Sequence, residues 1–133
     1  MRKQKSISEF SSERNIFLLE KFRESLARQS VISARKAFEY SVESPAPRFW
    51  VSEERATEVI SKMLKGEDVT EGMYPEKREM YLEIYRRVRR LIPAHRELPL
   101  CRLVFRVVNE RAPRSYLSWE RARRLIRLKK QRS

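Results

Sequence analysis

The sequence APRFWVSEERATEVI, at residues 46–60, returns at residues 112–126 as APRSYLSWERARRLI. Eight of the fifteen aligned positions are identical, and the two copies lie 66 positions apart in a chain of 133 residues. Most other positions keep their chemical class, since Trp50 aligns with Tyr116 and Val51 with Leu117. Similarity at a fixed spacing indicates a repeated structural unit, so we predict one unit used twice.

Each copy reads as an extended connector followed by the start of a helix. Pro47 and Pro113 fix their own φ and disfavour helical backbone in the residue before them. Ser52 and Ser118 then lie where an N-cap hydroxyl accepts a hydrogen bond from the first helical turn. We therefore expect a helix to begin directly after each serine.

The composition favours helices throughout the chain. There are only two glycines, and Leu, Ala, Arg, Glu and Lys are abundant. The apolar periodicity and the caps predict six helices, at about residues 12–28, 31–42, 52–65, 75–92, 98–109 and 118–130. We expect a basic flexible tail at residues 1–8, a first trihelical repeat at 9–66, a connector at 67–74 and a strongly basic second trihelical repeat at 75–133.

The last two helices of each unit, over about residues 30–65 and 98–130, resemble the helix-turn-helix family of DNA-binding domains. That family usually joins its two helices by three or four residues, whereas this connector has roughly eight or nine and contains Pro47 or Pro113. The Pro-Arg-aromatic-x-Ser-x-Glu-Arg-Ala pattern is also similar to small basic proteins of phages and mobile elements. The expected fold is thus all-α, with two tandem helix-turn-helix-like units packed into one compact domain.

Positive charge is concentrated in the C-terminal part of the chain. Residues 1–83 hold 15 basic and 15 acidic side chains, whereas residues 84–133 hold 16 basic and 3 acidic ones, so the net charge of +13 arises there. A local excess of this size attracts a polyanion, and nucleic acid is the first candidate.

A helical wheel of residues 118–130 places apolar side chains on one side and four cations, Arg123, Arg124, Arg127 and Lys130, on the other. Such a basic face is suited to lie along a groove or a phosphate backbone. The alternative is a solvated polar face that happens to be basic. Arg86, Arg89 and Arg90 form a second basic stripe. The competing interpretation is that Glu79 and Glu83, one turn back, pair with Arg86 and Arg87.

Other residues of the repeat have two interpretations each. Trp119 is a candidate for stacking on a base, whereas Trp50 and Tyr116 are expected to anchor the core. Arg55 and its counterpart Arg121 are expected to make an internal salt bridge or to bond connector carbonyls. Arg48 and Arg114 could contact phosphate or cap the preceding helix.

Catalysis finds no support in the sequence, and we expect no enzyme, no cofactor and no metal site. His95 is the single histidine, Asp68 the single aspartate and Cys101 the single cysteine, which excludes an internal disulfide. No apolar run approaches the roughly 18 residues of a membrane-spanning helix, so we expect a cytoplasmic protein.

Three functions remain open. The first is a small DNA-binding protein, a regulator or accessory factor of a phage or mobile element, that holds the duplex through arginine–phosphate contacts. The second is a structural or assembly protein of a phage particle or packaging machine. The third is an RNA-binding or ribosome-associated protein. In each case the acidic residues Glu53 and Glu58 make the first repeat a poor phosphate binder. We therefore expect it to serve as a scaffold or to contact a protein partner or a second copy of the chain.

Overall fold

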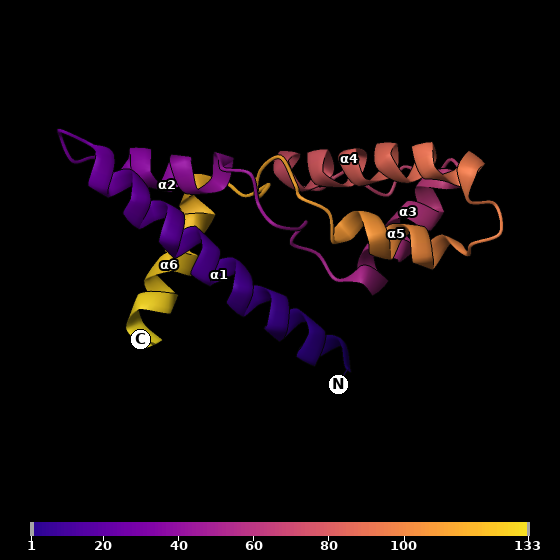
Figure 1. Cartoon of the computed structure of the whole chain (residues 1–133), viewed down its shortest axis with the longest axis horizontal. Helices are drawn as coiled ribbons and strands as arrows, with labels where there is room; N and C mark the ends of the chain where they lie inside the picture. The colour runs from indigo at the N-terminus through magenta and orange to yellow at the C-terminus, as the bar shows by residue number, and fades with distance from the viewer. Residues whose placement is uncertain (1, 133) are drawn as a thin grey trace. The chain divides into compact units, whose positions relative to one another are not determined.

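The computed structural model describes residues 2–132, and the side chains of residues 10–127. The described chain is all-α, as predicted, with no strand (Figure 1). In chain order the elements are α1 (Arg2–Arg28), α2 (Ala34–Glu43), α3 (Glu53–Leu64), α4 (Pro75–Leu91), the 3-10 helix η1 (Ile92–Ala94), α5 (Leu100–Val108) and α6 (Trp119–Arg132).

The predicted N-caps of the repeat are confirmed. The Ser52 side chain accepts a hydrogen bond from the backbone N–H of Arg55, and the Ser118 side chain accepts one from the backbone N–H of Arg121, both at 3.1 Å. Each bond satisfies one of the donors that a helix N-terminus otherwise leaves unpaired. The two equivalent helices, α3 and α6, therefore start in the same way and in the same register.

Three helix starts differ from the prediction. α1 begins at Arg2 rather than Ser12, so residues 2–8, which we expected to form a flexible tail, belong to this helix. Nothing in that segment breaks a helix, because it contains neither proline nor glycine. α2 begins at Ala34, since the Ser33 side chain caps it by accepting from the Lys36 N–H. α5 begins at Leu100, because Pro99 takes the N-cap position in extended conformation.

The helices form two compact units, and the tandem grouping into residues 9–66 and 75–133 is not confirmed. Unit 1 contains α1, α2 and α6, and unit 2, residues 47–111, contains α3, α4 and α5. α6 packs on α2 and α1, whereas α3 packs on α5 and α4. Each sequence repeat thus gives its third helix to the unit that holds the first two helices of the other repeat.

The connectors show why the third helices are exchanged. Ala46 and Ala112 form a reciprocal antiparallel bridge in which each N–H donates to the other's carbonyl at 2.9 Å. The backbone N–H of Ser115 donates to the Val42 carbonyl in unit 1, at 2.9 Å. The equivalent bond in unit 2, under the same offset of 66, runs from Phe49 to Val108 at 2.9 Å. These extended connectors carry the chain onward, whereas a tight turn would return it to the preceding helix.

Each unit has its own apolar core. In unit 1, α6 contributes Ala122, Leu125 and Ile126 to a buried cluster in which Phe22 and Phe38 stack with ring centroids 4.6 Å apart. In unit 2, buried side chains line the facing sides of the three helices, among them Val59, Ile60, Tyr81, Ile84, Val88, Val104 and Val107. The two cores together fix which side of α3 and of α6 faces solvent.

Candidate nucleic-acid interface

α6 presents a continuous exposed row of arginines. Packing of Ala122, Leu125 and Ile126 into the core of unit 1 turns Arg123, Arg124 and Arg127 to solvent, as the helical wheel predicted. Lys130 belongs to α6 by its backbone, but its side chain lies outside the residues described.

These arginines are not neutralised by acidic neighbours in the described part of the chain. Among residues 10–127, no ion pair involves Arg121, Arg123, Arg124 or Arg127. Glu120, in the first turn, is exposed and forms no ion pair with them. The cationic groups therefore keep their full charge for a polyanion.

The equivalent surface of α3 is internally paired. Arg55 forms an ion pair with Glu58 at 3.1 Å, as we expected for this repeated arginine. It also lies close to the buried Tyr81, whose pKa is raised by burial while the Arg55 charge opposes that rise. In α6 the position of Glu58 is taken by Arg124, so Arg121 faces another cation where Arg55 has a carboxylate.

A second helix adds a cation beside Arg121. The pKa of Arg14, on α1, is lowered to about 10, mainly by burial and to a lesser extent by the positive charge of Arg121. Arg14 itself donates to the Asn15 side chain at 3.1 Å. Sequence reasoning missed this pair, because it assigned Arg121 to an internal contact and gave no signal that α1 would approach α6.

The Trp119 side chain is in contact with other residues of unit 1. Its half-buried ring packs against the core of unit 1, and the Arg35 guanidinium lies 4.9 Å from the ring centroid. Arg35 also pairs with Glu39 at 3.4 Å. One ring face is thus occupied by a cation, which leaves less of Trp119 for the stacking role that we expected.

The arginines after the prolines contact the connectors. Arg48 donates from Nε to the Phe49 carbonyl at 2.9 Å and from a terminal nitrogen to the Val51 carbonyl at 2.7 Å. Arg114 is half-buried, with its guanidinium 5.1 Å from the Tyr116 ring centroid. Tyr116 is buried, as predicted, and has a positive φ of 57°.

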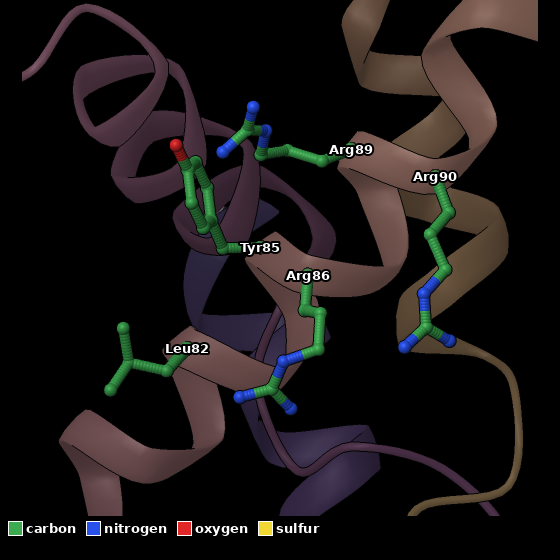
Figure 2. A pocket seen from close by; sticks show the side chains of 5 residues that line it. All are labelled: Leu82, Tyr85, Arg86, Arg89 and Arg90. Atoms are coloured by element: carbon green, nitrogen blue, oxygen red, sulfur yellow. The ribbon is translucent and has the colours of Figure 1, made fainter.

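The second predicted stripe lies on α4. Arg86, Arg89 and Arg90, together with Leu82 and Tyr85, line an open pocket of about 460 Å³ (Figure 2). Figure 2 shows the Arg89 side chain beside the Tyr85 ring, with 5.6 Å from guanidinium carbon to ring centroid. Arg86 is paired with Glu83, as the competing interpretation proposed.

The neighbouring Arg87 is a structural residue. It bonds Glu83 at 2.8 Å, Glu110 at 3.3 Å and the Arg111 carbonyl at 3.0 Å. Its guanidinium also lies 5.0 Å from the Phe49 ring centroid. This network ties α4 to the segment after α5 and removes Arg87 from the candidates for an external partner.

The two candidate stripes belong to units of very different charge. Unit 1 holds 17 basic and 7 acidic residues, a net of +10, whereas unit 2 holds 14 basic and 11 acidic ones, a net of +3. The exchange of α6 places the larger excess in unit 1, because α6 brings seven basic residues and one acidic residue into it. The arginines of α6 therefore lie in the stronger positive potential.

Within the described side chains, no group of three or more His, Cys, Asp or Glu residues is placed to hold a metal ion. No helix of the described chain has the length and apolar character needed to cross a membrane.

Comparisons of the chain with protein-family models, with curated protein sequences and with solved structures give no match.

Proposed function

We propose that this protein binds nucleic acid, double-stranded DNA in preference to RNA, by laying the arginine face of α6 along the phosphate backbone. The observation that carries the proposal is the exposure of Arg121, Arg123, Arg124 and Arg127 on one helix without an acidic partner among the described side chains. Four cations that have no acidic partner among residues 10–127 cost folding free energy through mutual repulsion. Phosphates that neutralise them would remove that cost and release counterions.

The geometry of α6 supports DNA as the form of nucleic acid. The helix has 14 residues, and its apolar side is anchored in the buried core of unit 1. An α-helix with its side chains fits the major groove of B-DNA, whereas the major groove of A-form RNA is too deep and narrow to admit one. Contacts to phosphates carry no base sequence, so the binding that these arginines provide is general for duplexes. A regulator or accessory factor of a phage or mobile element is the role that we assign to such a protein.

The test is fluorescence anisotropy with labelled duplex DNA, single-stranded DNA and double-stranded RNA at salt concentrations from about 50 to 200 mM. The double substitution Arg123→Glu and Arg127→Glu should weaken duplex binding by roughly 100-fold or more. It should also reduce the log–log salt slope by roughly 1.8, since each lost phosphate contact accounts for about 0.9.

The matched control is Lys62→Glu with Lys65→Glu, an equal change of charge at exposed positions of α3 and its C-cap. This control should change duplex affinity little. Equal losses in the two variants would refute a specific role for α6. Preferential binding of RNA would support the third function instead, and no binding to any nucleic acid at physiological salt would support an assembly protein whose basic face meets an acidic protein.

A further inference from the structure

The exposed side of α5 carries an apolar residue pair flanked by arginines. Leu103, Val104, Val107 and Val108 are buried, which turns the opposite side of this helix to solvent. On that side Phe105 is 55% exposed, and Cys101, one turn earlier, is exposed as well. Single exposed apolar side chains are ordinary on a protein surface, so the residues around Phe105 decide whether this face has a function.

The other repeat shows what the same face looks like without an apolar pair. Under the offset of 66, Cys101 and Phe105 correspond to Arg35 and Glu39 on α2. Those two residues form an ion pair at 3.4 Å, a common solution for a solvated helix surface. The same two positions therefore carry a solvated ion pair in one copy and an apolar pair in the other.

The charges beside Phe105 are of one sign. Arg102 and Arg106 are exposed, lie one helical turn apart on the same side of α5, and form no ion pair among the described residues. α5 contains no acidic residue. Two acidic residues contact the C-terminal end of this helix. Glu53 accepts a hydrogen bond from the Asn109 side chain at 3.3 Å, and Glu110, whose N–H donates to the Val107 carbonyl, pairs with Arg87 on α4.

We infer that this α5 face, Cys101, Arg102, Phe105 and Arg106, docks an acidic amphipathic helix of another protein. Phe105 inserts among the apolar side chains of that helix, and the two arginines pair with its carboxylates. Charge decides between the candidate occupants. A second copy of this chain would bring another net charge of +13, and a phosphate backbone offers nothing apolar to cover Phe105.

The docking face is independent of the proposed function, because it lies on α5 in unit 2 and shares no residue with α6. The test uses the full chain carrying Arg123→Glu and Arg127→Glu, so that the basic face of α6 does not capture an acidic probe. The probe is a fluorescein-labelled helical peptide with leucines along one face and glutamates on both flanks. Its comparison peptide has lysine at every glutamate position.

Binding is measured by anisotropy, and the contact surface is mapped by changes in backbone amide NMR signals. The acidic peptide should shift the signals of residues 100–109. Phe105→Ala should weaken binding about tenfold or more, as expected for a central aromatic contact. The control Tyr74→Ala removes an aromatic side chain that is 81% exposed in the same unit, and should leave the affinity unchanged.

Several results would overturn the inference. Absence of binding, or equal binding of the lysine peptide, would show that charge complementarity does not drive docking to this face. Equal losses of peptide affinity in Phe105→Ala and Tyr74→Ala would show that Phe105 is not a specific contact of the peptide. If Phe105→Glu in the otherwise native chain converted a dimer to a monomer by sedimentation, the occupant would be a second copy. If it weakened duplex binding while the peptide still bound, the face would belong to nucleic acid.

Discussion

α3 and α6 are equivalent helices of the two sequence repeats, but their exposed surfaces differ in charge. Ile60 and Ile126, at equivalent positions, are 0% and 1% exposed, so both copies bury the same side of the helix. On the outer side, Glu58 pairs with Arg55 in α3, whereas the equivalent Arg124 extends a row of arginines in α6. The buried positions are apolar in both copies, because a substitution there would lose packing contacts. Surface positions contribute little to packing, and they are basic in only one of the two copies.

The largest expected effect concerns the partners of these two helices. Ile126→Ala and Ile60→Ala should each lower the free energy of unfolding by about 2–4 kcal/mol, since each empties a fully buried site. The loss of stability should be largest in the unit that contains the substituted helix. In hydrogen exchange, Ile126→Ala should reduce protection in α1, α2 and α6, and Ile60→Ala should reduce it in α3, α4 and α5. Reduced protection of α4 and α5 in Ile126→Ala would contradict the exchange.

The next effect concerns the outer surfaces. Arg124→Glu gives Arg121 the same acidic neighbour that Arg55 has in α3, so it removes one cation and neutralises a second. Duplex affinity should fall by about 10- to 30-fold in anisotropy titrations. The reverse change on α3, Glu58→Arg, frees Arg55 but should raise affinity only about two- to threefold, because unit 2 has the lower net charge. Comparable changes in both variants would mean that net charge alone governs binding.

A smaller effect is expected from α4. Arg89→Glu with Arg90→Glu should lower duplex affinity by about three- to fivefold, since Arg89 already lies against Tyr85 and the unit is nearly balanced in charge. The control on the same helix is Lys77→Glu with Arg78→Glu, two exposed residues outside the pocket. A loss as large as that for the α6 double variant would place the principal phosphate contacts on α4.

The smallest effect tests the repulsion between α1 and α6. Arg121→Gln should raise the Tm by roughly 1–3 °C near pH 7 at low salt, because it removes a cation that opposes protonation of Arg14. The folded-state pKa of Arg14, about 10, lies below its ordinary value, so folding releases a proton at pH values between the two. Wild-type stability therefore rises with pH in that window.

The gain from Arg121→Gln should accordingly shrink as the pH rises through about 10, where Arg14 loses its charge in the folded protein. Thermal unfolding followed by circular dichroism at a series of pH values measures this change. High salt should diminish the same gain, since it screens exposed charges. A gain independent of both pH and salt would show that it comes from helix propensity alone.

The sequence predicted the helices and their caps more fully than their partners. The capping roles of Ser52 and Ser118 and the burial of the two isoleucines were predictable, because capping and apolar periodicity depend on residues only a few positions apart. Periodicity defines which side of α6 is apolar, but it does not say which core receives that side. One signal was present, since a proline-containing connector of eight or nine residues is too long for the tight turn of the helix-turn-helix family.

The candidate site, too, was only partly predictable from the sequence. The exposure of Arg123, Arg124 and Arg127 follows from the helical wheel, and the structure agrees with it. The approach of Arg14 to Arg121 depends on packing between the first and last helices, which no local pattern records. The tail at residues 1–8 was expected to be flexible because it lacks apolar periodicity, although helix formation in such a polar segment needs only favourable propensities.

The exchange of third helices also sets an order of events during synthesis on the ribosome. Unit 2 is continuous, from residue 47 to residue 111, so its three helices can assemble as soon as that segment has left the exit tunnel. α1 and α2 are made earlier but lack the helix that covers Leu18, Phe22 and Phe38 until α6 arrives. The older part of the nascent chain therefore waits with its apolar side uncovered, and the strongly cationic unit is the last to become complete.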